Sequence, residues 1–289
     1  MAHIRSFAGA LLLLLASQLP ATAQTSTEPL AAPEQLTRAQ DAPLNPALPT
    51  LFLVGDSTCR NQADLGWGDH AAHFFDLQRI NIANRCIAGR STRTYRKEAW
   101  SKTLAEVKAG DFVLIQLGHN DGGALDGAKP RGSLKGVGEE TREVTLVNGE
   151  KEVVHTYGWY IRQYIADARA KGATPLLLTL TVRNIWSEGA DGKKHIERDM
   201  GYNQSLAQIA ATQKVALLDM GNQEADALEK IGPEATARLF PIDHTHTSAN
   251  GAELNARLVA RSILQSGLPL SRFLTSTNQL MQDSSSANK

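Results

Sequence analysis

The segment from Thr50 to Ser57 constrains the fold more than any other part of this chain. It begins with a short apolar run, Leu51 to Val54, and passes directly into Gly55-Asp56-Ser57. A continuous apolar run of this length is typical of a buried strand in a parallel sheet. Gly55 permits a sharp bend after the strand. Ser57 is therefore predicted to lie at the carboxyl edge of the sheet, where open α/β sheets bind their ligands.

The rest of the chain alternates between apolar runs and segments with helical periodicity. We predict strands over residues 51–54, 80–83, 112–117, 176–180 and 215–218, and helices over 68–77, 100–107, 157–170, 200–212 and 250–264. This alternation predicts an α/β fold in which five parallel strands carry helices on both faces. The predicted domain, residues 49–274, is long enough to bury one well-formed core.

One segment interrupts the alternation. Two β-prone runs within residues 142–155 flank Asn148-Gly149, a dipeptide typical of a two-residue hairpin turn. The segment follows the third predicted strand, on the edge of the sheet expected to carry function. We therefore expect a hairpin that borders the functional site.

Both ends of the chain are predicted to lie outside this domain. Residues 1–23 contain Arg5, a leucine-rich core and Ala21-Thr22-Ala23, a combination typical of a cleavable signal peptide. Residues 24–48 are predicted to be a flexible linker and residues 275–289 a disordered tail. We therefore expect a secreted or periplasmic protein without membrane insertion, acting as a monomer.

Charge and cysteine content narrow the function further. Thirty basic residues balance 30 acidic ones, so overall charge gives no reason to expect nucleic acid as a partner. Export to an oxidising compartment makes a disulfide between Cys59 and Cys86 plausible. Two free buried thiols are equally compatible with the sequence, so both states stay open.

The polar residues that follow the predicted strands suggest acyl transfer. Such chemistry needs a nucleophile, a base oriented by an acid, and donors for an oxyanion. Ser57 follows the first strand, and Asp243 and His246 have the spacing for a carboxylate to orient an imidazole. The backbone N–H groups of Ser57 and Gly89 and the side chain of Asn120 are the expected oxyanion donors. Alternatively, Gly-Asp-Ser is an ordinary turn.

Metal binding is a second alternative, because Asp243, His244 and His246 together offer enough ligands for an ion. It leaves the serine, glycine and asparagine segments unexplained. We therefore expect no metal and no cofactor.

In order and rough spacing, these segments resemble those of the SGNH (GDSL) hydrolases, and most of all the rhamnogalacturonan acetylesterase branch. The resemblance rests on five motifs, which are Gly55-Asp-Ser-Thr58, Gly66-Trp-Gly68, Ala88-Gly-Arg-Ser91, Gly118-His-Asn-Asp-Gly-Gly123 and Phe240-Pro-Ile-Asp-His-Thr-His-Thr-Ser248. It implies a flavodoxin-like three-layer sandwich and a metal-free serine esterase that removes acetyl groups from pectin. The alternatives are an esterase for another acetylated glycan, a lipid or a small ester, and a non-catalytic carbohydrate-binding relative.

Two further features suggest how a polysaccharide would be bound. Four cations lie between Arg90 and Lys97, beside the expected oxyanion site. We predict that Arg93 or Arg96 contacts the carboxylates of an anionic polymer such as pectin; the alternative is that Glu98 and polar loops pair with these arginines. Trp186 is predicted to be exposed and to stack on sugar rings.

Overall fold

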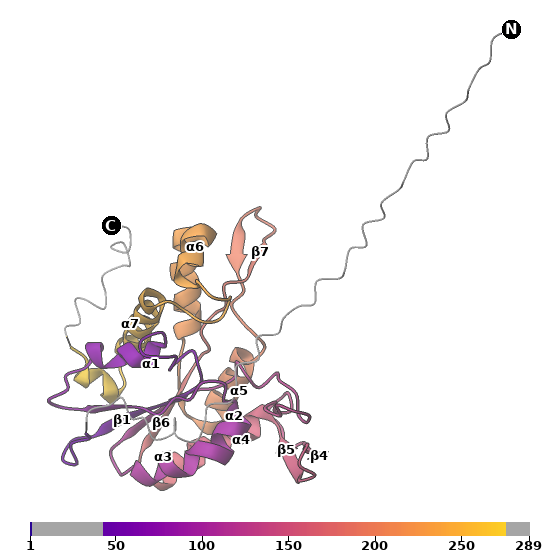
Figure 1. The fold of residues 1–289 in the computed structure, drawn as a ribbon. Coiled ribbons are helices and arrows are strands. Elements are labelled where there is room, and N and C mark those ends of the chain that lie inside the picture. The colour runs from indigo at the N-terminus through magenta and orange to yellow at the C-terminus, as the bar shows by residue number, and fades with distance from the viewer. Residues whose placement is uncertain (2–42, 276–289) are drawn as a thin grey trace.

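The computed structural model describes residue 1 and residues 43–275 and is built around a central parallel sheet (Figure 1). Its strands are β1 (Thr50–Gly55), β2 (Asn81–Asn84), β3 (Phe112–Gln116), β6 (Thr174–Leu178) and β9 (Ala216–Leu218). They lie in the order β2-β1-β3-β6-β9, which is that of flavodoxin-like folds. The predicted five-stranded parallel sheet is thus confirmed.

The register of the sheet fixes where the functional loops begin. Gly55, the last residue of β1, pairs with Gln116, the last residue of β3. The chain segments that contain Ser57 and Asn120 therefore leave the sheet at the same edge. This follows from parallel pairing, because neighbouring strands then share one carboxyl edge.

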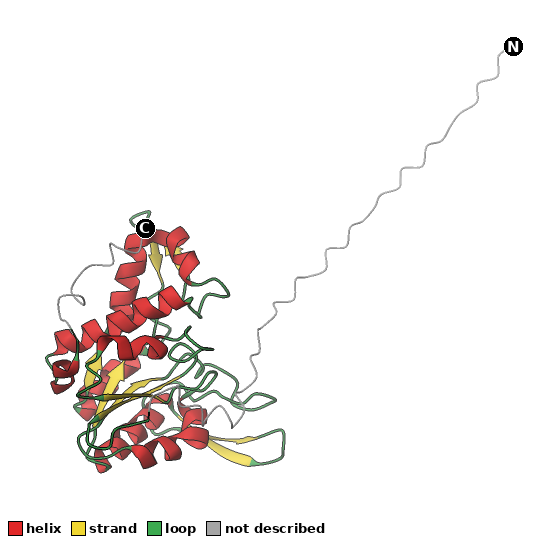
Figure 2. Cartoon of the chain, turned by 60° about the vertical axis from the view of Figure 1, so that its left-hand side comes forward, coloured by secondary structure: helices red, strands yellow, loops and turns green. Residues whose placement is uncertain are grey.

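Side chains of β1 alternate between two apolar cores, as the two-residue repeat of a strand requires. Phe52 and Val54 belong to one core, and Leu51 and Leu53 to the other. Helical elements cover the first core: α2 (Thr92–Tyr95), the π-helical segment η3 (Arg96–Trp100), α3 (Ser101–Glu106), α4 (Tyr157–Ala170) and α5 (Asn203–Gln213). The second lies under α1 (Trp67–His70), η2 (Ala71–Phe74), α7 (Ala249–Ser266) and η4 (Pro269–Phe273). Figure 2 shows helices on both sides of the sheet, giving three layers.

Two hairpins extend from this sandwich. The predicted one is confirmed: β4 (Thr141–Thr145) pairs with β5 (Lys151–His155) in antiparallel register. The second, β7 (Trp186–Glu188) with β8 (Lys194–Ile196), was not predicted and lies beside α6 (Met220–Leu239) in Figure 1. Ile196 packs there with Ala225 and Leu228 of α6 in a small third core.

The main differences from prediction concern helices. The helical segment expected from Trp100 already begins at Thr92, where the Ser91 hydroxyl accepts a hydrogen bond from the Thr94 N–H and caps it. Helix α6 was missed because Gly232, with φ 79°, and Pro233 interrupt it and read as a helix end in the sequence.

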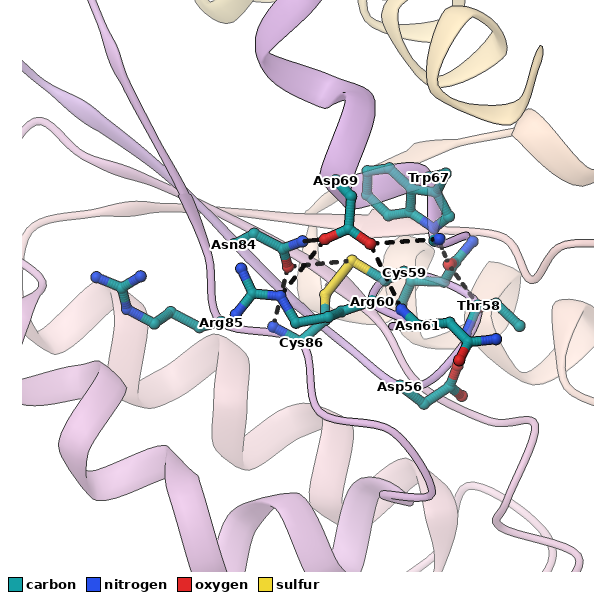
Figure 3. Close-up of a disulfide and its surroundings, with 12 residues drawn as sticks. Asp56, Thr58, Cys59, Arg60, Asn61, Trp67, Asp69, Asn84, Arg85 and Cys86 are labelled. Carbon is teal, nitrogen blue, oxygen red and sulfur yellow. Dashed lines mark hydrogen bonds and ion pairs between the residues drawn. A yellow bond between two sulfur atoms is a disulfide. The ribbon is translucent and has the colours of Figure 1, made fainter. Parts of the chain in front are cut away.

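A disulfide ties the loop after β1 to the segment after β2 (Figure 3). Cys59 and Cys86 are bonded, with Cα atoms 5.9 Å apart and a separation of 27 positions in sequence. On the chain-entropy model a loop of that length contributes about 3 to 4 kcal/mol. Of the two states that the sequence left open, the structure has the disulfide.

Asp69 of α1 supports the same region from the other side. Its carboxylate accepts hydrogen bonds from Asn84 Nδ2 at 3.0 Å and from the Gly66 N–H at 3.3 Å (Figure 3). Burial raises the pKa of the Asp69 carboxyl to about 6, against opposing hydrogen bonds and the charge of Arg60. A Cβ atom on Gly66 would lie 2.4 Å from the Cys59 carbonyl oxygen, so this close approach requires glycine.

The expected signal peptide (1–23), most of the expected linker and nearly all of the expected tail lie outside the described residues. Residues 43–48 are described, and Asn45 exchanges hydrogen bonds with the Asn81 side chain, both at 2.9 Å. This part of the expected linker therefore lies against the domain. Among the helices that the structure describes, none has both the length and the apolar character to span a membrane.

Candidate active site

Ser57, His246 and Asp243 form a continuous chain of hydrogen bonds beyond the carboxyl end of β1. His246 Nε2 lies 2.9 Å from Ser57 Oγ, and His246 Nδ1 lies 2.7 Å from Asp243 Oδ2. The three residues come from two loops that are 189 positions apart at the Ser57–His246 contact. The structure thus brings together the three side chains that the sequence proposed as nucleophile, base and acid.

Asp243 is held rigidly by its own loop. Its second oxygen, Oδ1, accepts the backbone N–H groups of Thr245 at 2.6 Å and His246 at 2.7 Å. Partial burial disfavours its charge, but the hydrogen bonds from the side chain and backbone of His246 and from Thr245 hold the pKa of the Asp243 carboxyl below its usual value. An ionised Asp243 selects the tautomer of His246 that carries its proton on Nδ1, which leaves Nε2 free to accept a proton.

Asp56 fixes the turn that presents Ser57. The Asp56 carboxylate accepts the backbone N–H and the hydroxyl of Thr58, both at 2.9 Å. Burial raises the pKa of Asp56 to about 6, opposed mainly by these two bonds. Its partners are therefore those of a turn residue, and Asp56 takes no part in the chain that joins Asp243, His246 and Ser57.

Gly89 and Asn120, the expected oxyanion donors, belong to one hydrogen-bonded unit. Asn120 Nδ2 donates to the Arg90 carbonyl oxygen at 2.9 Å, and the amide retains a second N–H. Gly89 has φ 74°, a conformation that glycine adopts without strain. Asn120 is therefore tied directly to the turn that contains Gly89.

Asp121 anchors the loop that carries Asn120. Its buried carboxylate accepts hydrogen bonds from the Thr92 N–H at 3.1 Å, from the Thr92 hydroxyl, and from Ser133 Oγ at 2.8 Å. Burial raises the pKa of Asp121 to about 6 in spite of these bonds. Sequence reasoning missed this residue, although its place directly after Asn120 was a usable signal.

The structure contradicts the predicted substrate contact of Arg93. The side chain is 3% exposed. Its Nε lies 2.7 Å from Glu152 Oε1, and its Nη1 donates to the carbonyl oxygens of Leu125 and Gly132. Arg93 therefore joins α2 to the β4–β5 hairpin and the loop before it. Its remaining nitrogen, Nη2, is buried, so a polymer cannot reach it.

The predicted substrate contact of Arg96 is also replaced by an internal pair. Arg96 Nη1 lies 2.8 Å from Asp167 Oδ2 of α4, and its guanidinium stands 5.7 Å from the centre of the Tyr164 ring. Arg90 is buried too and pairs with Glu98 at 2.8 Å. The expected partner Glu98 thus pairs with Arg90, whereas Arg93 and Arg96 pair with Glu152 and Asp167.

Trp186 is half-buried and not fully exposed as expected. Its indole N–H donates to Asn184 Oδ1 at 2.8 Å, and the ring packs against the third apolar core. The rest of the ring lies at the surface of the β7–β8 hairpin. The position keeps Trp186 available for a sugar contact but does not require one.

A cavity of about 510 Å³ adjoins Asn120. Its lining includes three cationic side chains, Arg131, Lys135 and Arg183, and one carboxylate, Glu197. Arg183 Nε is buried without a hydrogen-bond partner, and burial lowers the pKa of its guanidinium. Within residues 43–275, no ion pair engages Arg131 or Arg183. Sequence reasoning missed these cations because they are scattered singly over the chain.

In the described part of the chain, the Asp243 loop does not gather the three metal ligands that the sequence alternative required. Asp243 is engaged with His246, and His244, the third ligand of that alternative, is exposed. Among residues 43–275, one group of three suitable side chains lies close enough to share an ion, and it consists of His70, His73 and Glu253.

An α/β sheet with a hydrogen-bonded Ser–His–Asp chain beyond the carboxyl ends of its strands is an arrangement that recurs among serine hydrolases. A model of the GDSL-like lipase/acylhydrolase family matches residues 53–254, so the chain belongs to that family. This match spans both loops that build the site.

Individual proteins agree with this assignment. The chain is 36% identical over 230 residues to a rhamnogalacturonan acetylesterase of Emericella nidulans, covering 79% of this chain and 90% of that protein. It is 31% identical to a probable rhamnogalacturonan acetylesterase of Bacillus subtilis, covering 78% of this chain and 96% of that protein.

A solved structure shares the fold. The crystal structure of the Bacillus subtilis protein YxiM aligns with a TM-score of 0.60 at 23% identity. The alignment covers 77% of this chain and 58% of that protein, so the chain spans little more than half of YxiM.

Proposed function

We propose that this protein is an exported serine esterase that removes O-acetyl groups from an acidic, pectin-type polysaccharide. The observation that carries the proposal is the chain of two short contacts, Ser57 Oγ to His246 Nε2 at 2.9 Å and His246 Nδ1 to Asp243 Oδ2 at 2.7 Å. Further support comes from relatives at 31 and 36% identity whose names specify rhamnogalacturonan acetylesterase.

In the proposed reaction, Ser57 Oγ attacks the acetyl carbonyl carbon while His246 Nε2 takes the hydroxyl proton. The negative oxygen of the tetrahedral intermediate accepts hydrogen bonds from the N–H groups of Ser57 and Gly89 and from the Asn120 amide. The C–O bond to the sugar then breaks, and His246 returns the proton to the sugar oxygen. Water repeats the sequence on the acetyl-enzyme and releases acetate.

The choice of an acidic polysaccharide rests on the cavity beside Asn120. Arg131 and Arg183 line it, and arginine suits contact with a sugar carboxylate because its planar guanidinium can bind one in a bidentate manner. Pectic galacturonate carries such a carboxylate and a neutral xylan backbone does not. An esterase for a neutral glycan or a small ester is the second candidate, since the triad alone does not discriminate among acetyl esters.

Replacing the nucleophile tests the chemistry. Ser57→Ala is expected to lower the rate of acetate release by about a millionfold, as removal of a triad serine does elsewhere. Acetate release from acetylated pectin measures the effect. Ser187→Ala, which changes an exposed serine of β7, is the matched control and keeps full activity. Substantial activity in folded Ser57→Ala protein would refute Ser57 as the nucleophile. Absence of activity in the original protein would refute the esterase proposal and favour a non-catalytic carbohydrate-binding protein.

A further inference from the structure

Two histidines and a glutamate meet on the face of the molecule covered by α1 and α7. His70 is the last residue of α1, His73 lies one turn later in η2, and Glu253 projects from the second turn of α7. His70 Nδ1 lies 2.8 Å and His73 Nδ1 3.2 Å from the same oxygen, Glu253 Oε2. The two rings meet edge to face with centres 5.6 Å apart, so their Nδ1 atoms converge on one point.

The hydrogen-bond partners of His70 favour a cation between its Nδ1 atom and Glu253 Oε2. Its Nε2 lies 2.7 Å from the Asp64 carbonyl oxygen, which can only accept a hydrogen bond, so Nε2 carries a proton. Its Nδ1 faces the Glu253 carboxylate, which is also an acceptor when ionised. In this tautomer, His70 Nδ1 directs a lone pair at the Glu253 carboxylate oxygen. A metal cation between the two atoms would relieve that unfavourable contact.

We propose that His70, His73 and Glu253 bind a divalent transition-metal ion of the zinc type. Two imidazole nitrogens and one carboxylate oxygen form a set of ligands that zinc accepts, with water in the remaining position. The three ligand atoms lie within 4.8 Å of one another. The hydrogen bond from His70 Nε2 to the Asp64 carbonyl is the kind of outer contact that orients a metal-bound histidine. His73 is 62% exposed, so an ion can enter from solvent.

Another histidine shows what distinguishes this group. His195 also lies beside two acids, but its Nε2 faces Asp191 at 3.0 Å and its Nδ1 faces Glu229 at 3.5 Å. Opposite edges of one ring cannot bind a single ion. His195 is therefore an ordinary paired surface histidine, and it serves as the matched control.

A metal ion at His70, His73 and Glu253 would connect α1, which is bonded to the loop after Ser57, with α7, which follows His246. Helix α1 is bonded to the loop that follows Ser57, since the N–H groups of Trp67 and Gly68 donate to the Thr58 and Cys59 carbonyl oxygens at 3.1 and 2.8 Å. Helix α7 begins just after His246, and Thr247 Oγ1 donates to the Leu65 carbonyl oxygen at 3.0 Å. An ion held by both helices would stabilise the domain from outside the reacting atoms.

Zinc titration of the untagged mature protein, stripped with a chelator, tests the proposal. Calorimetry is expected to show one zinc ion per chain, and saturating zinc to raise the Tm by about 5 °C. His73→Ala and Glu253→Gln are each expected to weaken zinc binding at least about tenfold, the loss of one ligand being worth at least 1.4 kcal/mol. His195→Ala is expected to bind zinc as the original chain does.

Two results would overturn the proposal. One is the absence of zinc binding by the original protein. The other is zinc binding that survives in both His73→Ala and Glu253→Gln, which would place the ion elsewhere. Activity on a small aryl acetate, measured in each variant, verifies that the domain is folded, and we expect it to stay within about twofold.

Discussion

The arginines of residues 90–97 and those of the cavity beside Asn120 have the same chemistry and opposite environments. Arg93 is 3% exposed and ion-paired to Glu152, and Arg96 is paired to Asp167. Arg131 and Arg183 line the cavity instead, and no ion pair within residues 43–275 engages either of them. The dense run of charge that stands out in the sequence is paired inside the domain, whereas the scattered cations line a cavity.

The comparison shows that a local count of charges does not identify a binding surface. A buried ion pair compensates most of its own desolvation cost and leaves little field for a substrate. A partly buried cation without an ion-pair partner is not compensated for its desolvation, so binding an anion in the adjoining cavity would be favourable.

Arg93→Ala is expected to destabilise the domain by about 3 to 5 kcal/mol, because it leaves Glu152 without its main partner and two carbonyl oxygens without donors. The ion pair with Arg93 is also what chiefly lowers the pKa of Glu152. Urea unfolding measures the loss. The ratio of KM for acetylated pectin to KM for an aryl acetate is expected to stay unchanged, and a selective rise for pectin would restore Arg93 as a substrate contact.

Glu224 is a buried acid without a cationic partner, and its effect should depend on pH. Burial raises the pKa of Glu224 from 4.5 to about 8, against hydrogen bonds from the Val182 N–H and Asn255. Between these two values the folded state keeps a proton that the unfolded state has released, so this residue makes stability fall as pH rises from about 4.5 to about 8. Above that window the loss is complete.

Glu224→Gln should remove this component, since a glutamine oxygen can still accept the Val182 N–H. Relative to the original chain, we expect the variant to gain about 4 kcal/mol on going from acid to alkaline conditions. Paired urea unfolding curves at both ends of the window measure the gain. A stability difference that is independent of pH would show that Glu224 titrates normally.

Arg183→Gln, alone and with Arg131→Gln, is expected to raise KM for acetylated pectin up to about tenfold, or 1.4 kcal/mol. KM for a neutral aryl acetate should change little. Added salt should reduce the difference, because screening lengths fall from about 10 Å at 0.1 M to about 3 Å at 1 M. Arg238→Gln changes an exposed arginine of α6 and is the control. Equal responses of both substrates would remove the argument for an acidic polymer.

Arg96→Ala should have the smallest effect, at most about 1 kcal/mol of stability. Its pair with Asp167 is partly solvated, with side chains 26 and 29% exposed, so water replaces the lost contact. Thermal unfolding measures the contribution of Arg96 to stability, and KM for pectin measures any contact with substrate. A tenfold rise in KM would return Arg96 to the binding surface.

Prediction from sequence succeeded where the signal was local. The strand that ends at Gly55 and the helix Tyr157–Ala170 have strong apolar periodicity, and both lie where expected. The short strands of the β7–β8 hairpin are only three residues each, too short for an alternating pattern. The spacing of Asp243 and His246 correctly predicted that the two side chains meet, because both lie in one turn. His246 Nδ1 is 2.7 Å from Asp243 Oδ2.

The sequence by itself determined the five strands of the sheet, the edge of the sheet that carries Ser57, and the residues that could complete a triad, because backbone periodicity and turn chemistry act over a few neighbouring residues. Only the tertiary structure decided which cations are paired and which are not. The partner of Arg93 lies 59 residues away in sequence, and that of Arg96 lies 71 away. Such pairing depends on how hairpin and helix pack after the sheet has formed, and no local pattern encodes it.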